Sequence, residues 1–269
     1  MTRGQREELE RKFQANTAAG AVLVAAAGAG IIGALVFVPR LLRLFGPGLL
    51  AMTLLLGRAA PSGAVEGQPR HLIYLHGYIV QAQQDARPKH PRFGYYELRQ
   101  IEDALRERGF VVHAEIRPRS ASVADSADRV VQQVRHLLDS GVPAHHVSVV
   151  GASMGGTIAL LASARLQEPE VRFCVLGSCL DESVRRLRAN AGRGPIGHVL
   201  SIREASDEVV GECPTWSAAD ESYPGLIARE IMVETGLSHG FLYRPLPEWV
   251  EPVVDWAGAS GQDDSGHAR

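Results

Sequence analysis

From residue 70 onward, short apolar runs alternate with stretches in which apolar residues recur at helical spacing. The runs predict buried strands and the stretches between them predict helices. The predicted strands are 71–76, 110–116, 147–150, 171–176, 199–202 and 231–233, and the clearest predicted helices are 95–108, 123–138, 154–166 and 247–256. Strands that alternate with helices usually form a parallel sheet covered on both faces. The pattern therefore predicts an α/β fold with a mostly parallel sheet of about six strands.

The beginning of the chain has a different pattern. Residues 1–16 are polar and charged, whereas residues 17–38 contain no charged side chain at all. An apolar run of about 20 residues is long enough to cross a bilayer, so we predict a single transmembrane helix at 17–38. A buried Ala/Gly-rich helix is the alternative. Basic residues flank both ends of this segment with a slight excess before it, which favours a cytoplasmic N-terminus but leaves the side of the following domain open.

Three further segments complete the predicted organisation. Residues 39–69 form a membrane-proximal apolar segment, which lies at the bilayer surface or makes a second, imperfect span, and then a Pro/Gly/Ala-rich linker. Residues 70–257 contain the alternating pattern and form the predicted globular domain. Residues 258–269 are polar and small, and we expect a disordered tail there.

Composition narrows the function classes. The chain has 269 residues and a formal net charge of -2, and its Lys and Arg residues are scattered, so we expect no nucleic-acid partner. Its three cysteines do not make a disulfide framework and have no zinc-ligand spacing, although a single bridge is possible. We therefore expect neither a metal nor a cofactor. The oligomeric state is not determined by the sequence.

The strongest chemical signal follows the predicted strand 147–150. The residues Gly151-Ala152-Ser153-Met154-Gly155 lie between this strand and the predicted helix 154–166. A Gly-x-Ser-x-Gly sequence between a strand and a helix is typical of a sharp turn that exposes a nucleophilic serine. Glycines are needed there because a side chain at either position would collide with nearby backbone. The alternative is a Gly-rich turn whose serine only caps the helix.

These residues, with others farther along, resemble the α/β-hydrolase superfamily of serine esterases, lipases and thioesterases over about residues 70–257. In that family the triad follows the chain order Ser, Asp or Glu, His. The resemblance implies Asp207, after strand 199–202, as the acid, and His239, after strand 231–233, as the general base. The other candidates for the acid are Asp181, Glu204 and Glu208.

The resemblance also implies an oxyanion hole, a pair of backbone N–H groups that bind the developing negative charge. The first predicted strand ends in Leu75-His76-Gly77-Tyr78. The implied donors are the N–H groups of Tyr78 and of Met154, which follows the nucleophile. We expect His76 to brace this loop rather than to take part in the chemistry.

The chain is shorter than many members of this family. It has no room for two extra strands at the start of the sheet or for a large lid, so a trimmed, lidless sheet is expected. Residues 79–94 form a basic loop expected to hang over the site. The implied function is hydrolysis of a small-molecule or lipid-like ester or thioester through an acyl-enzyme. An amidase or peptidase of the same fold, or a non-catalytic membrane-anchored scaffold, is the alternative.

Overall fold

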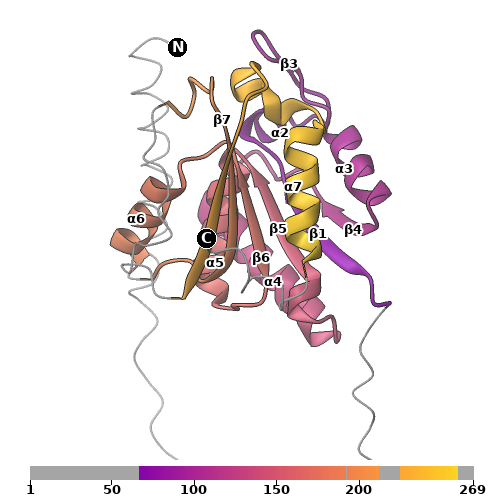
Figure 1. Cartoon of the computed structure of the whole chain (residues 1–269), viewed down its shortest axis with the longest axis vertical. Helices are drawn as coiled ribbons and strands as arrows, with labels where there is room; N and C mark the ends of the chain where they lie inside the picture. The colour runs from indigo at the N-terminus through magenta and orange to yellow at the C-terminus, as the bar shows by residue number, and fades with distance from the viewer. Residues whose placement is uncertain (1–66, 192, 212–224, 260–269) are drawn as a thin grey trace, which may run out of the picture.

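The computed structural model describes residues 67–191, 193–211 and 225–259 (Figure 1). Six strands form one sheet in the order β4-β1-β5-β6-β7-β8, and every neighbouring pair is parallel. The strands are β1 (Arg70–Leu75), β4 (Phe110–Ala114), β5 (Val147–Ala152), β6 (Arg172–Leu176), β7 (Gly197–Glu204) and β8 (Leu226–Val233). The predicted α/β fold with a parallel sheet of about six strands is confirmed.

Helices cover both faces of this sheet, and α7, in yellow, lies along one of them (Figure 1). The helices are α2 (Tyr78–Gln83), α3 (Leu98–Glu107), α4 (Val123–Asp139), α5 (Met154–Leu166), α6 (Leu180–Ala191) and α7 (Pro247–Gly258). Two short 3-10 helices, η1 (Ala144–His146) and η2 (Ser238–Tyr243), precede β5 and α7. Only α6 connects β6 to β7, so no lid domain is inserted between them in the described residues.

Strand alternation divides the buried residues into two cores. Leu72 and Tyr74 of β1 belong to the core shared with α3 and α7, whereas Ile73 and Leu75 belong to the core shared with α4, α5 and α6. Successive side chains of a strand point to opposite faces, so a strand buried on both faces needs apolar residues at consecutive positions. This is why the strands were visible in the sequence as short continuous apolar runs.

The strand order places a site at one edge of the sheet. β1 lies between β4 and β5 in the sheet. The connection from β1 to β4, which contains α3, and the connection from β4 to β5, which contains α4, therefore cover opposite faces of the sheet. Ligands of open α/β sheets bind beyond the carboxyl ends of the strands where the order changes direction in this way. The residues that follow β1, β5, β7 and β8 therefore converge at this edge.

Some elements differ from the sequence-based expectation. The segment 79–94 is not an open loop: it contains α2 and a two-stranded antiparallel hairpin made of β2 (Lys89–His90) and β3 (Gly94–Tyr95). β7 extends beyond its predicted range at both ends, and β8 begins earlier in the chain than predicted. The predicted transmembrane helix at 17–38 and the segment 39–66 lie outside the described residues. Within the part of the chain that the structure describes, no helix is both long and apolar enough to cross a bilayer.

Candidate active site

Ser153 occupies a strained turn between β5 and α5. Its backbone has φ 54° and ψ −117°, a conformation that residues with a side chain rarely adopt. The turn is possible only because of its glycines. A Cβ atom at Gly151 would lie 2.2 Å from the carbonyl oxygen of Gly155, and one at Gly155 would lie 2.0 Å from the carbonyl oxygen of Leu75. The strain therefore points the serine side chain out of the strand and toward the loops that follow β7 and β8.

The structure brings three of the predicted residues together in one hydrogen-bonded chain. The Nε2 atom of His239 lies 2.9 Å from the Oγ atom of Ser153. Its Nδ1 atom lies 2.7 Å from an Oδ atom of Asp207. His239 and Asp207 are both buried, at 7% and 6% exposure. A carboxylate accepts but does not donate, so the neutral imidazole carries its proton on Nδ1 and offers Nε2 to the serine hydroxyl.

Asp207 is held by its own loop. The Oδ1 atom accepts hydrogen bonds from the backbone N–H groups of Val209, at 2.9 Å, and Val210, at 3.3 Å, which leaves Oδ2 for His239. Glu208 instead points to solvent and pairs with Arg92, and Asp181 lies in the first turn of α6. Of the candidates for the acid with a described side chain, Asp207 alone contacts the imidazole.

Glu204 lies at the end of β7 and acts on the site indirectly. Its side chain is 3% exposed, and one carboxylate oxygen accepts from the N–H and hydroxyl of Ser206, each at 2.7 Å. The other oxygen accepts from the N–H groups of Thr235, at 3.1 Å, and Gly236, at 2.9 Å. The buried carboxylate thus joins the loop that carries Asp207 to the loop that carries His239. Buried carboxylates need several donors of this kind to offset their desolvation.

A second connection joins these two loops. The N–H of Ser238 donates to the hydroxyl of Ser206, at 3.2 Å, and the N–H of Glu208 donates to the hydroxyl of Ser238, at 3.3 Å. Ser238 has φ 51°, so the residue before His239 is also in the left-handed region. Together with Glu204, these contacts fix the distance between the acid and the base.

The two predicted oxyanion donors lie at the beginnings of two helices. Tyr78 is the first residue of α2 and Met154 is the first residue of α5. The first N–H groups of a helix have no partner within it. Neither N–H group donates a hydrogen bond within the described residues. A Cβ atom placed on Gly77 would lie 3.8 Å from the Cβ atom of Ser153, so the two turns are adjacent.

His76 fixes the peptide that carries the N–H of Tyr78. Its Nδ1 atom lies 2.9 Å from the carbonyl oxygen of Gly77, and its Nε2 atom accepts from the N–H of Arg117 at 3.1 Å. A carbonyl accepts only, so Nδ1 carries the proton. The carbonyl of Gly77 and the N–H of Tyr78 belong to one planar trans peptide and point in opposite directions. Binding the carbonyl therefore sets the direction of the N–H.

Burial, with the guanidinium of Arg117 beside it, lowers the pKa of His76 to about 4. The ring is fully buried and stays neutral near pH 7. Both of its nitrogens are then used, one as a donor and one as an acceptor, which is the arrangement that the loop requires. The predicted bracing role of His76 agrees with this geometry.

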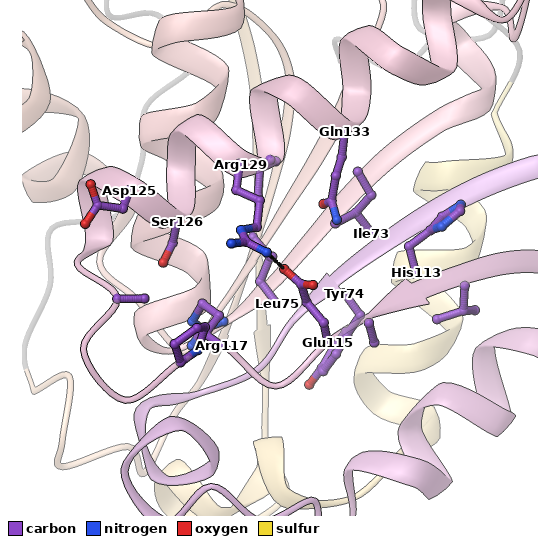
Figure 2. Close-up of a pocket in the computed structure, with 15 residues that line it drawn as sticks. Ile73, Tyr74, Leu75, His113, Glu115, Arg117, Asp125, Ser126, Arg129 and Gln133 are labelled. Carbon is purple, nitrogen blue, oxygen red and sulfur yellow. Dashed lines mark hydrogen bonds and ion pairs between the residues drawn. The ribbon is translucent and has the colours of Figure 1, made fainter.

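Arg117 links this loop to a separate cavity. Its guanidinium donates to the carbonyl oxygen of His76 at 2.6 Å and to the side chain of Gln81 at 3.1 Å. Figure 2 shows Arg117 beside a cavity of about 350 Å³ lined by residues of β1, β4 and α4, where Arg129 pairs with Glu115. Ser153 and His239 are not among the lining residues. The cavity therefore lies behind the oxyanion loop and is not the reaction site.

The basic residues of segment 79–94 are occupied within the protein. Arg87 forms an ion pair with Glu97 at 2.8 Å, Arg92 forms one with Glu208 at 2.8 Å, and Lys89 lies over the ring of Tyr95. Arg87 and Arg92 are therefore each paired with a carboxylate of the protein. The contact of Arg92 joins the β2–β3 hairpin (residues 89–95) to the loop that follows β7.

Three contributors to the site were not identified from the sequence. They are Phe93, whose ring lies 6.3 Å from that of His239, Arg117, and Glu204 in its bracing role. Each acts through a contact between segments far apart in the chain, and no local motif marks them. Within the described residues, no group of three or more His, Cys, Asp and Glu side chains is arranged to hold a metal ion.

No known protein family model matches the chain, and no curated protein matches its sequence. An α/β serine hydrolase without a lid from Xanthomonas campestris, XC6422, has a TM-score of 0.44 and 14% identity over 72% of this chain and 84% of that one. An esterase from Pyrobaculum calidifontis has a TM-score of 0.44 and 20% identity over 72% and 77% of the two chains. SOBER1 from Arabidopsis thaliana has a TM-score of 0.41 and 13% identity over 71% and 98%. Similarities this distant do not identify a reaction.

Proposed function

From the α/β-hydrolase fold of the described residues and the geometry of its site, we propose that the protein is a serine hydrolase that cleaves carboxylic esters or thioesters. The observation that carries the proposal is the chain of contacts from Ser153 Oγ to His239 Nε2, at 2.9 Å, and from His239 Nδ1 to Asp207, at 2.7 Å. A serine hydroxyl is a weak nucleophile until an adjacent base takes its proton. His239 is in position to do so, and Asp207 stabilises the imidazolium that forms.

In the first half of the proposed reaction, Ser153 Oγ attacks the acyl carbon while its proton passes to Nε2 of His239. The carbonyl oxygen becomes an oxyanion and accepts hydrogen bonds from the N–H groups of Tyr78 and Met154. When the tetrahedral intermediate collapses, the bond to the leaving group breaks and His239 returns the proton to the departing oxygen or sulfur. The product is an acyl-enzyme on Ser153 and a free alcohol or thiol.

The second half repeats these steps with water. His239 takes a proton from a water molecule, whose oxygen attacks the acyl carbon of the ester on Ser153. The same two N–H groups hold the second oxyanion, and the proton on His239 then returns to Ser153 Oγ as the carboxylic acid leaves. Removal of one oxyanion donor typically costs about 3 kcal/mol of transition-state stabilisation. Both donors are backbone groups, so the positions of their peptides, not their side chains, matter.

A fluorophosphonate probe tests the nucleophile directly. An activated serine forms an Oγ–P bond with the probe as fluoride leaves. We expect the full chain to be labelled, and we expect Ser153→Ala and His239→Ala to abolish labelling while circular dichroism shows that both variants are folded. A well-folded wild-type protein that is not labelled would overturn the proposal and favour a non-catalytic scaffold on the same fold.

The bond that is cleaved needs a second measurement. An ester, a thioester and an anilide with the same acyl group present the same carbonyl but different leaving atoms. We expect turnover of the ester and the thioester at rates well above that of the anilide. A larger kcat/KM for the anilide would instead assign an amidase.

The membrane association proposed for this protein depends on sequence alone, because residues 17–38 lie outside the described residues. The uncharged run predicts that the full chain stays with the membrane fraction after alkaline carbonate extraction. An arginine in the middle of the run, as in Ile31→Arg, is expected to weaken this association. A wild-type protein that is fully extracted by carbonate would contradict the proposed span. A bilayer location would favour lipid-like esters as substrates.

A further inference from the structure

Phe93 lies beside the general base of the proposed reaction. Its ring centroid is 6.3 Å from that of His239, with the two planes tilted by 53°. A Cβ atom on Gly240 would lie 3.2 Å from Cδ1 of Phe93, so the ring packs on the backbone that follows the histidine. Tyr243 supports the ring at 5.5 Å in an edge-on arrangement. Phe93 is only partly buried, so one part of its surface stays open.

The β2–β3 hairpin holds Phe93 in this position. The Nδ1 atom of His90 accepts from the N–H groups of Arg92, at 3.2 Å, and Phe93, at 3.3 Å, which closes the turn between the two strands. The ring of His90 stacks on that of Phe93 at 4.6 Å. Arg92 then reaches across to Glu208, which follows the acid Asp207, at 2.8 Å. The hairpin is therefore tied both to the base loop and to the acid loop.

The proposed mechanism fixes where a leaving group must lie. The oxyanion faces the N–H groups of Tyr78 and Met154, whereas the leaving atom must face Nε2 of His239 to receive its proton. The rest of the leaving group therefore extends past the imidazole. Phe93 lies next to that imidazole on a separate segment, so it is placed to contact this part of the substrate.

We propose that Phe93 forms one wall of the leaving-group subsite and makes the enzyme select esters with apolar, flat leaving groups. This inference rests on the proposed hydrolase function and specifies its substrate class. An aromatic ring offers an apolar face and prefers offset or edge-on contact with another ring. The nearby cations Arg87 and Arg92 are paired with carboxylates and do not supply a free charge for an anionic leaving group.

The test compares two acetyl esters, phenyl acetate and hexafluoroisopropyl acetate, whose alcohols have similar acidity but different shapes. The measured quantity is the ratio of their kcat/KM values in wild type, Phe93→Ala and Phe93→Leu. We expect Phe93→Ala to lower kcat/KM for phenyl acetate relative to that for hexafluoroisopropyl acetate by roughly 5- to 10-fold. The decrease should be smaller in Phe93→Leu. Tyr95→Ala is the matched control, because Tyr95 is on the same hairpin but contacts Arg87 rather than His239. Its ratio should stay at the wild-type value.

Fluorophosphonate labelling separates the possible failures. Fluoride is too small to reach Phe93, so labelling of Phe93→Ala should stay within about twofold of wild type if the residue contacts only the leaving group. An unchanged ester ratio in Phe93→Ala would overturn the inference. A parallel loss of labelling and of both ester activities would also overturn it, because Phe93 would then only position His239. A wild-type protein that is not labelled would refute the hydrolase function itself, and this inference with it.

Discussion

Asp207 and Glu204 are three residues apart, yet only Asp207 contacts the imidazole of His239, at 2.7 Å, while Glu204 binds backbone N–H groups of the same two loops. The two carboxylates therefore have separable roles. Asp207→Asn is expected to lower kcat by about 10⁴-fold with little change in stability, because an amide that donates to Nδ1 imposes the wrong tautomer on the histidine. Steady-state kinetics and urea unfolding of the variant would check this.

Glu204→Gln is the matched comparison for the acid. An amide nitrogen in place of one oxygen would face the N–H groups of Ser206 or of Thr235 and Gly236. We therefore expect the free energy of unfolding to fall by about 2–3 kcal/mol. The kcat of the folded fraction should fall less than tenfold. A Glu204→Gln protein that is folded but as inactive as Asp207→Asn would reverse these assignments.

The turn at Ser153 predicts a ranking of three glycine substitutions. A Cβ atom at Gly155 would lie 2.0 Å from the backbone oxygen of Leu75, which cannot move away, whereas one at Gly156 would lie 2.8 Å from a side-chain methyl of Val175. Gly194 has nothing within 4 Å. We expect Gly155→Ala to destabilise the protein by at least about 3 kcal/mol, Gly156→Ala by about 1–2, and Gly194→Ala by less than about 0.5. Urea unfolding curves would measure all three, and any other order would contradict the packing described at the turn.

The strands and main helices could be predicted because their signal is local. A strand buried on both faces, such as β5, is a continuous apolar run, and the Gly-x-Ser-x-Gly turn directly follows it. Ser153 was predicted from this turn, whereas Asp207 and His239 were implied by the resemblance to α/β-hydrolases, in which the acid and the base follow strands. The edge strand β8 was predicted too short, because its partly buried and exposed positions alternate and only its last residues form an apolar run.

The remaining features depend on contacts between distant segments. The β2–β3 hairpin has strands of two residues each and no apolar alternation, so nothing in its sequence distinguishes it from a loop. Glu204 was a rival for the acid because position along the chain does not separate it from Asp207. Only the fold shows that it faces Thr235 and Gly236, about thirty residues later.

A buried ion pair between β7 and β8 supports the loop that carries the acid. Arg203 donates to Glu230 at 2.8 Å, and the side chains are 8% and 7% exposed. Glu230→Gln removes the negative charge from a buried arginine and is expected to cost about 3–5 kcal/mol. The double substitution Arg203→Met with Glu230→Leu should recover most of this loss, because it removes both buried charges. Urea unfolding of the two variants tests this, and a double variant no more stable than the single one would contradict it.

The neutral state of His76 predicts a pH dependence of stability. Its pKa is lowered to about 4 in the folded protein, against about 6.5 for an unperturbed histidine. Above pH 6.5 the ring is neutral in both states and contributes no pH dependence. Between pH 6.5 and pH 4 the unfolded chain binds a proton at this residue and the folded chain does not, so acid favours unfolding. The folded protein should lose roughly 3 kcal/mol of stability from His76 across this window.

His76→Gln isolates this effect, because glutamine keeps a donor and an acceptor but does not titrate. Other histidines with lowered pKa values, such as His71 and His113, act in the same direction and are present in both proteins. The free energy of unfolding of the wild type should therefore fall by roughly 3 kcal/mol relative to that of His76→Gln as the pH falls from 6.5 to 4. Parallel pH profiles in urea unfolding would mean that His76 is not kept neutral by its burial. In that case the Nε2 atom of His76 would be protonated below pH 6.5 and could no longer accept from the N–H of Arg117.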